Sequence, residues 1–243
     1  MRRYGLVGRT LKHSFSQTYF TGKFKTSGME DTVYENFELP SIDVLSTLLA
    51  TYPDLQGLNV TIPYKEDVLP FLTSMNEVVE KIGACNCIKI AEGKLAGFNT
   101  DVVGFRQSLE PKLKPHHQKA LVLGTGGAAK AIWYVLDELG IAYKKVSRRK
   151  EGADFSYEEL TPDILGEYLL IVNTTPLGMY PNTEAAPELP YEAIGASHFL
   201  FDIVYNPEKT AFLEKGEGQG AQTCNGYEML IGQAEESWRI WNS

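Results

Sequence analysis

Three polar side chains surround a proline in the stretch Asn59 to Lys65, which reads NVTIPYK. Pro63 cannot belong to a central strand, so the pattern predicts a strand that ends at Ile62 and a helix that begins in YKEDVLPFL. This explains the proline, but it does not explain the amide, hydroxyl and ammonium groups of Asn59, Thr61 and Lys65. Such groups are costly in a core and unnecessary at a surface. They can bind a small polar ligand and supply a proton to it.

A glycine turn in LVLGTGGAAKA is the second candidate site. Gly124, Gly126 and Gly127 follow an apolar strand and precede a helix of about a dozen residues. Glycine permits the tight turn and lets backbone N–H groups approach a pyrophosphate, to which the helix N-terminus adds partial positive charge. Ala129 takes the third glycine position, a substitution that the fingerprint allows. The pattern predicts nucleotide binding; the alternative is a loop that only closes the strand.

The end of the next predicted strand reads VSRRK and indicates which nucleotide binds. A chain that selects NAD carries a carboxylate about twenty residues after the glycine turn, and none is present here. Arg148 and Arg149 offer planar donors for a 2′-phosphate, so the sequence favours NADP. The alternative is a solvated basic run at a strand end.

The segment after Arg149 is short. Only about eighteen residues separate it from the strand predicted in YLLIVNTT, which is too few for a helix, a strand and a second helix. We therefore expect one helix to be shortened or absent there, leaving the adenine end of the cofactor more open. A full helix directly after Arg149 would refute this expectation.

Composition and charge narrow the class of protein. The chain has 243 residues, 43% hydrophobic and 22% charged, which is typical of globular proteins with one large or two smaller domains. Its net charge of -8 argues against a nucleic-acid partner or an anionic membrane surface. No apolar run approaches the roughly 20 residues that span a bilayer.

Cysteine and histidine usage indicates a reducing compartment and no metal. Cys85, Cys87 and Cys224 form no CxxC pair, and MRRYGLVG lacks the apolar region of a secretory signal, so we expect a cytoplasmic protein. The histidines show no metal-ligand spacing and stand at positions 13, 116, 117 and 198.

Strand-like and helix-like runs alternate along the chain, which predicts an α/β fold. The first hundred residues follow this pattern, the polar stretch KPHHQK suggests a boundary, and a second α/β unit starts near Lys119. The chain ends in a helical run that contains Trp238 and Trp241. These tryptophans suit either docking within the chain, which we favour, or a dimer seam, so the protein is expected to be a monomer or a homodimer.

The separated motifs together resemble the shikimate dehydrogenase family, in the family's order and from end to end. They are HSFSQ (13–17), GLNVTIPYKEDVLPFL (57–72), IGACN (82–86), GFNTDVVGF (97–105), GTGGAAKA (124–131), NTTPLGM (173–179), DIVYNPEKTAFL (202–213) and NGYEMLIGQAEESW (225–238). The resemblance implies two α/β domains separated by a cleft: an open-sheet catalytic domain (1–101, completed by helix 226–241) and a Rossmann-like NADP-binding domain (102–225). It implies reversible NADPH-dependent reduction of 3-dehydroshikimate to shikimate, a step of chorismate and aromatic amino acid biosynthesis.

Motif matching also implies roles for single residues. Lys65 and Asp101 would form the catalytic pair, in which the ammonium stabilises the developing alkoxide and protonates it while the carboxylate holds the ammonium. Substrate contacts or positioning are implied for Ser14, Ser16, Asn59, Thr61, Asn86, Tyr205 and Gln233. Cofactor contacts are implied for Gly124, Gly126, Gly127, Ala128, Ser147, Arg148, Arg149, Thr174, Met179 and Gly226.

Several positions depart from the family's usual patterns HSLSP, NVTIPHK, GAVNT and NTDG. Gln17 replaces proline, Tyr64 replaces histidine, and Val102 replaces glycine beside Asp101, where it could alter the domain hinge. Cysteines flank Asn86 in place of valine and threonine, and either one faces the cleft or both are small buried side chains. These departures put selectivity and rate in doubt more than reaction type.

Three other functions remain as alternatives. YFTGK matches the YxxxK of short-chain dehydrogenases, but there the glycine turn precedes the tyrosine, and here it follows by about a hundred residues. A quinate/shikimate dehydrogenase, which often uses NAD, is disfavoured by the arginine pair. A non-catalytic ligand sensor would not need to keep both Lys65 and Asp101.

Overall fold

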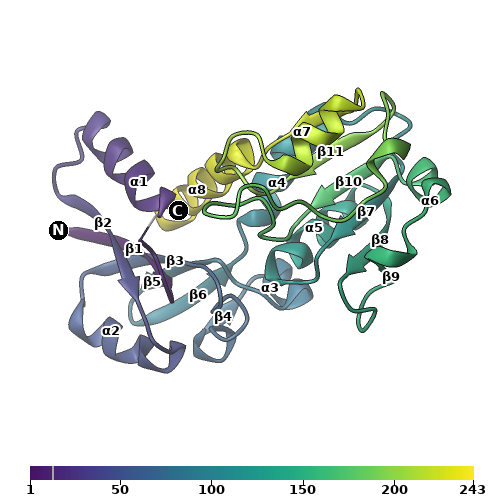
Figure 1. Ribbon diagram of the computed structural model, residues 1–243. Coiled ribbons are helices and arrows are strands. Elements are labelled where there is room, and N and C mark those ends of the chain that lie inside the picture. Colours follow the sequence, from purple (N-terminus) through teal and green to yellow (C-terminus); the bar gives the residue numbers. More distant parts are fainter. Residues whose placement is uncertain (13) are drawn as a thin grey trace. The chain divides into compact units, whose positions relative to one another are not determined.

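The computed structural model describes residues 1–12 and 14–243, so His13, the first residue of the HSFSQ motif, lies outside the described residues. The chain forms two compact units, each with its own sheet (Figure 1). The first unit comprises Met1–Thr100 and Ala234–Ser243, and the second comprises Asp101–Gln233. The predicted α/β class is confirmed. The assignment of substrate and NADP binding to separate domains stays a prediction.

The first unit contains a mixed sheet with the strand order β2-β1-β3-β5-β6-β4. Its strands are β1 (Arg2–Gly8), β2 (Thr32–Glu38), β3 (Leu55–Val60), β4 (Ser74–Met75), β5 (Cys87–Ala91) and β6 (Lys94–Phe98). Its helices are α1 (Phe15–Thr26), α2 (Leu45–Thr51) and α3 (Glu77–Ile82). β1, β2 and β3 are parallel, so the segments that follow β1 and β3 leave the same edge of the sheet.

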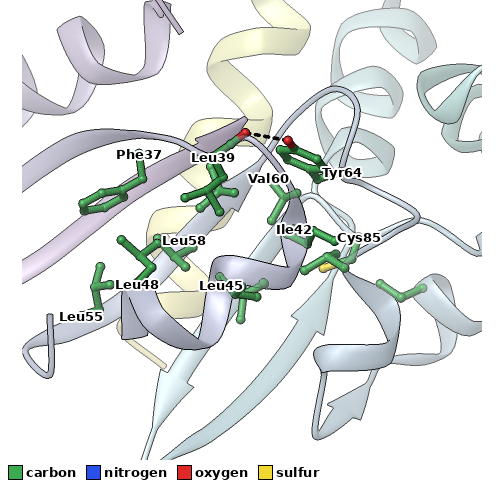
Figure 2. Close-up of a cluster of buried hydrophobic side chains, with 14 residues drawn as sticks. Phe37, Leu39, Ile42, Leu45, Leu48, Leu55, Leu58, Val60, Tyr64 and Cys85 are labelled. Atoms are coloured by element: carbon green, nitrogen blue, oxygen red, sulfur yellow. Dashed lines mark hydrogen bonds between the residues drawn. The ribbon is translucent and has the colours of Figure 1, made fainter. Parts of the chain in front are cut away.

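Each face of this sheet has its own buried cluster. Figure 2 shows the cluster on the α2 side, where Leu45 packs with Leu58 of β3. On the other face Phe20 of α1 packs with Tyr4 of β1 and with Trp241 from the end of the chain. Because neighbouring residues of a strand point to opposite faces, β1 contributes Val7 to the first cluster and Tyr4 and Leu6 to the second.

The C-terminal residues Ala234–Ser243 complete the first unit. The ring of Trp241 stacks on Tyr4 with centroids 4.9 Å apart, and its Nε1 donates a 3.0 Å hydrogen bond to the carbonyl oxygen of Ile88. Gly57 makes room for the indole, because a Cβ there would lie 2.3 Å from Nε1. The end of the terminal helix therefore packs within the chain.

The YxxxK residues of α1 have a structural role. Lys23 Nζ donates hydrogen bonds of 2.6 Å to both carboxylate oxygens of Glu235, and the Tyr19 hydroxyl donates to the same carboxylate. Both side chains therefore tie α1 to the C-terminal residues of the first unit.

The second unit contains a parallel sheet with the strand order β12-β11-β10-β7-β8-β9. Its strands are β7 (Lys119–Leu123), β8 (Ala142–Ser147), β9 (Phe155–Ser156), β10 (Leu170–Asn173), β11 (Phe199–Asp202) and β12 (Gln222–Cys224). The helices are α4 (Asp101–Leu109), α5 (Gly127–Glu138), α6 (Pro162–Glu167), α7 (Ala211–Gly218) and α8 (Tyr227–Trp241), the last of which continues into the first unit at Ala234.

Helices cover both faces of the second sheet, as in a doubly wound fold. Leu200 of β11 packs in a cluster with Leu165 of α6 and Phe212 of α7. Its neighbour Phe201 points to the opposite face, where Phe105 of α4 meets it edge-on with ring centroids 5.1 Å apart. The strand order reverses between β7 and β10, and ligands bind at the carboxyl ends of strands at such a switch point.

The segment after Arg149 contains little helix, as its short length predicts. A turn, the strand β9 and a 3₁₀ helix at Tyr157–Glu159 replace the usual crossover helix, and α6 has 6 residues. The expectation of a shortened or absent helix is confirmed.

Candidate active site

The segment that carries Lys65 differs from the predicted helix. β3 ends at Val60, residues 62–68 form turns, and a 3₁₀ helix follows at Leu69–Phe71. The predicted α-helix is wrong because Pro70 lacks an N–H donor and disfavours helical backbone at the residue before it. Lys65 therefore stands on a compact turn after the strand.

Two anchors fix the backbone on either side of the Lys65 side chain. The Tyr64 ring is buried in the α2-side cluster and its hydroxyl donates a 2.6 Å hydrogen bond to the carbonyl oxygen of Leu39 (Figure 2). The Lys65 carbonyl oxygen accepts a 2.7 Å hydrogen bond from the Cys85 N–H. With its neighbour buried and its own carbonyl bonded, the backbone at Lys65 is held in place.

Asn59 and Asn86 belong to a buried polar network. Nδ2 of Asn59 donates to the Asn86 carbonyl oxygen at 3.3 Å and to Ser237 Oγ at 2.8 Å, while Oδ1 accepts from the Tyr34 hydroxyl at 2.9 Å. Oδ1 of Asn86 accepts from the Thr100 backbone N–H at 2.6 Å. The Thr100 and Ser237 hydroxyls are 3.2 Å apart and close the circuit.

The network holds the Asn59 side chain in a fixed position. Both ends of the Asn59 amide are bonded to protein, which suits a residue that positions others. Burial raises the pKa of Tyr34 well above its usual value, against a smaller opposing effect of the Ser16 side chain, so Tyr34 remains a donor. The sequence analysis assigned no role to Tyr34, which lies outside the motifs, or to Thr100 and Ser237, which lie within them, because spacing does not show which distant hydroxyls meet.

Ser14 and Ser16 stand at the start of α1, after the carboxyl end of β1. Ser14 is the N-cap residue, and its side chain accepts a 3.3 Å hydrogen bond from the Gln17 N–H. Ser16 is buried and belongs to the first turn. Their assignment to a substrate carboxylate stays a prediction.

Asp101, Tyr205 and Gln233 belong to the second unit. Asp101 is buried and begins α4, where a carboxylate is favoured by the helix dipole. Burial raises the pKa of the half-buried Tyr205, and Gln233 Nε2 donates to the Leu230 carbonyl oxygen at 3.1 Å. The pairing of Asp101 with Lys65 of the first unit stays a prediction.

The glycine turn links β7 to α5 at the switch point. Gly124 has φ +108, and a Cβ there would lie 2.6 Å from Thr174 Oγ1, so only glycine fits beside the end of β10. Gly126 is the N-cap residue of α5 and Gly127 is its first helical residue. Ala129 is fully buried, as the helix–strand contact of the fingerprint requires. The assignment of this helix start to a pyrophosphate stays a prediction.

The remaining predicted cofactor residues stand on the surrounding elements. Arg148 and Arg149 follow Ser147, the last residue of β8, and both are exposed. Thr174 Oγ1 donates to the Leu123 carbonyl oxygen at 2.7 Å, and Met179 is exposed in the same loop. Ala128 in the first turn of α5 is half-buried. A Cβ at Gly226 would lie 2.1 Å from the Ile203 carbonyl oxygen, so that glycine is sterically required.

Comparison with known proteins decides the family. Residues 6–88 match the family described as Shikimate dehydrogenase substrate binding domain. Shikimate dehydrogenase (NADP(+)) of Caldicellulosiruptor saccharolyticus is 38% identical over 258 residues, covering 99% of this chain and 92% of that protein. The chain belongs to the shikimate dehydrogenase family.

Solved structures of related enzymes share the fold. Shikimate 5-dehydrogenase from Thermus thermophilus, in complex with NADP(H) and shikimate, has a TM-score of 0.87 and 30% identity, covering 99% of this chain and 93% of that chain. Quinate dehydrogenase from Corynebacterium glutamicum, in complex with NAD, has a TM-score of 0.87 and 27% identity with the same coverage.

The structure accounts for two departures from the shikimate dehydrogenase patterns. Gln17 uses the backbone N–H that proline lacks to complete the Ser14 cap, and its Oε1 accepts a 2.9 Å hydrogen bond from Asn36. Tyr64 is a core residue bonded to Leu39. The effect of Val102, which is buried in α4, on the shikimate dehydrogenase hinge has no structural explanation here.

Both cysteines beside Asn86 are fully buried, so the alternative in which one is exposed to a ligand is wrong. Burial raises the pKa of Cys87, which keeps its thiol protonated. In this member of the family the two thiols are therefore packing residues.

Two classes of feature are absent from the part of the chain that the structure describes. No group of three metal-binding side chains occurs among residues 1–12 and 14–243. Within the same ranges, no helix is both long and apolar enough to cross a bilayer.

Proposed function

We propose that this chain catalyses the reversible NADPH-dependent reduction of 3-dehydroshikimate to shikimate. The observation that carries the proposal is that Lys65 and Asp101 are both present in a chain of which 99% aligns with a shikimate dehydrogenase (NADP(+)). Relatives named shikimate dehydrogenase (NADP(+)) support the reaction and the cofactor. A sensor that only binds ligands would not need this proton-donating pair.

Lys65 has the central role in the chemistry. Reduction of the ketone creates an alkoxide, and the Lys65 ammonium both stabilises its charge and donates the proton that completes the hydroxyl. In the reverse direction the neutral amine accepts that proton. Asp101 holds the ammonium in place by its opposite charge. NADPH supplies the hydride, and NADP⁺ accepts it in the reverse direction.

Neutral polar groups bind the substrate. Ser14 and Ser16, at the N-terminus of α1, suit the ring carboxylate, because hydroxyl groups and helix N–H groups bind an anion without a buried cation. Thr61, Asn86, Tyr205 and Gln233 are assigned to the ring hydroxyls and the carbonyl. Asn59, bonded to protein at both ends of its amide, positions Asn86 through the carbonyl of that residue.

The second unit binds NADP. The backbone of the turn Gly124 to Gly127 and Ala128 fits the pyrophosphate, and Arg148 and Arg149 offer charge-assisted hydrogen bonds to the 2′-phosphate. The rest of the cofactor is assigned to Ser147, Thr174, Met179 and Gly226. The exposed arginines and the absence of a carboxylate in VSRRK favour NADP over NAD.

We place the reaction in the cytoplasm. Cys85, Cys87 and Cys224 are free thiols, which persist in a reducing compartment. The proposed partners are small molecules, the substrate and NADP. Both a monomer and a homodimer are compatible with the proposed roles.

A direct assay tests the proposal. Purified protein is mixed with shikimate and NADP, and the absorbance of NADPH is followed beside matched samples that contain NAD or quinate. Reduction of NADP with shikimate is expected to be fastest. Turnover of quinate with NAD at a similar rate would instead favour a quinate/shikimate dehydrogenase, and ligand-dependent thermal stabilisation without turnover would favour the sensor.

Substitution of Lys65 tests the mechanism. Lys65→Ala should lower kcat by roughly 10² to 10⁴ with a much smaller effect on substrate binding. Lys94→Ala, at an exposed lysine of the same unit, is the matched control and should leave kcat unchanged. Weak substrate binding with kcat retained would show that Lys65 binds substrate and donates no proton.

A further inference from the structure

Asp202 is a fully buried carboxylate that none of the roles above uses. It is the last residue of β11 and pairs in register with Asn173, the last residue of β10. Its Oδ1 accepts 3.0 Å hydrogen bonds from Asn173 Nδ2 and from the Val204 backbone N–H. Its Oδ2 accepts a 2.6 Å hydrogen bond from Thr210 Oγ1.

None of these three partners carries a charge. A buried carboxylate with only neutral donors is costly, and burial raises the pKa of Asp202 to about 7 despite the three hydrogen bonds. A buried carboxylate at the end of a strand whose other residues are apolar indicates a function that an apolar residue could not perform. The hydrogen bonds that its three partners make to the neighbouring loops indicate that function.

The first partner organises the loop that begins with Thr174. Oδ1 of Asn173 accepts a 3.1 Å hydrogen bond from the Thr175 N–H and a 2.7 Å hydrogen bond from the Thr175 hydroxyl. The Thr175 hydroxyl in turn accepts from the Leu177 N–H at 3.3 Å. The path from Asp202 therefore passes along the loop towards Met179.

The other two partners organise the loop that contains Tyr205. Val204, bonded to Asp202, accepts a 3.1 Å hydrogen bond from the Gly226 N–H on its carbonyl oxygen. Thr210 is the N-cap residue of α7, and a Cβ at Gly178 would lie 3.2 Å from the Thr210 Cβ. The 174–179 loop thus packs against the end of the 203–210 loop. Asp202 bonds directly to the second loop and reaches the first through Asn173.

We propose that Asp202 is a positioning residue for the cofactor site, because it accepts hydrogen bonds from Asn173, Val204 and Thr210 at once and so fixes the 174–179 loop relative to the 203–210 loop. The inference rests on the proposed function, which assigns Thr174, Met179, Tyr205 and Gly226 to these loops. Asp202 touches neither ligand in this role.

NADPH binding by the full chain, followed by fluorescence titration, tests the inference. Asp202→Ala leaves three donors unpaired and should raise the Kd for NADPH by about tenfold or more, because small misplacements in a site are costly. Asp202→Asn should rescue binding to within about threefold, since its Oδ1 accepts as before and its Nδ2 can donate to Thr210. Loss of stability alone would raise the apparent Kd only by the reciprocal of the folded fraction, so the titrations are made where circular dichroism shows each variant to be fully folded.

Two further variants keep the test decisive if Asp202→Ala does not fold. Thr175→Val preserves shape but removes the hydroxyl between Asn173 and Leu177, and it should raise the Kd for NADPH by about threefold or more. Asp163→Asn, at an exposed carboxylate in α6, should match the wild type. An unchanged Kd in folded Thr175→Val would overturn the inference, whereas a wild type that binds no NADPH would overturn the proposed function.

Discussion

Ser237 Oγ accepts a 2.8 Å hydrogen bond from Nδ2 of Asn59, a residue 178 positions earlier in the chain. Both side chains are buried in the first unit, and Ser237 also meets the Thr100 hydroxyl. The C-terminal helix therefore closes the polar network that holds Asn86, a predicted substrate contact. A residue of the last helix therefore helps to position a predicted substrate contact.

Removal of that hydroxyl should weaken substrate binding. Ser237→Ala leaves a buried Asn59 donor unpaired, so we expect the free energy of unfolding to fall by about 1–3 kcal/mol and the KM for shikimate to rise several-fold. Steady-state kinetics and urea unfolding measure the two effects. Ser74→Ala, at an exposed serine of β4, is the control, and an unchanged KM in Ser237→Ala would show that the network does not position Asn86.

Tyr64 should stabilise the turn that carries Lys65. Tyr64→Phe keeps the buried ring but leaves the Leu39 carbonyl oxygen without its 2.6 Å partner, so the free energy of unfolding should fall by about 1–2 kcal/mol. Urea denaturation measures this change. Tyr52→Phe, at a half-buried tyrosine beside the same cluster, is a comparison that leaves the turn unaltered, and an equal loss in both variants would contradict a specific role for Tyr64.

Arg148 should determine the choice of cofactor. Arg148→Ala removes a charge-assisted hydrogen bond to the 2′-phosphate, so the KM for NADP should rise by roughly tenfold or more while the KM for NAD stays constant. The ratio of kcat/KM for the two cofactors measures the effect. An equal decrease for NADP and NAD would place Arg148 away from the 2′-phosphate. Arg239→Ala, at an exposed arginine paired with Glu236, serves as the control.

Asp202 should make stability depend on pH in the direction opposite to that of a typical carboxylate. Burial raises its pKa to about 7 from 3.8, so the folded state binds the proton more tightly than the unfolded state. Its contribution to stability is complete below the unfolded pKa and is lost as the pH rises through about 7. The same carboxylate also raises the pKa of Tyr191, in which burial is the larger cause.

Urea unfolding of the wild type and of Asp202→Asn between about pH 5 and pH 8 measures this contribution. The wild type should lose stability relative to the variant as the pH rises, by at most about 1.4 kcal/mol per pH unit. A constant difference between the two proteins would show that Asp202 does not titrate in this range.

In the second unit, local sequence patterns were sufficient to predict the glycine turn, the helix after it and the shortened segment after Arg149. The glycine turn and the helix after it are specified by adjacent residues, and the structure has Gly124 beside Thr174 with α5 starting at Gly127. The shortened segment after Arg149 followed from chain length alone. Family and reaction were predicted from the ordered motifs, and both are confirmed.

In the first unit, contacts between residues far apart in the sequence could not be predicted. The helical pattern after Pro63 gave way to turns because Pro70 interrupts it and because Tyr64 is held in the core by Leu39. The partners of Asn59 could not be found from spacing, since Tyr34 and Ser237 reach it from distant segments. The roles of the predicted site residues stay predictions until the variants are measured.

The placement of Trp241 against Tyr4 and Gly57 has a consequence for synthesis of the protein. The first unit is discontinuous in sequence, and its last side chains leave the ribosome after the entire second unit. Until then Gly57, Tyr4 and Phe20 lack the indole that packs against them, which leaves apolar surface exposed. The half of the molecule that is translated first is therefore completed last, and a nascent chain must keep that surface from aggregating while the second sheet forms.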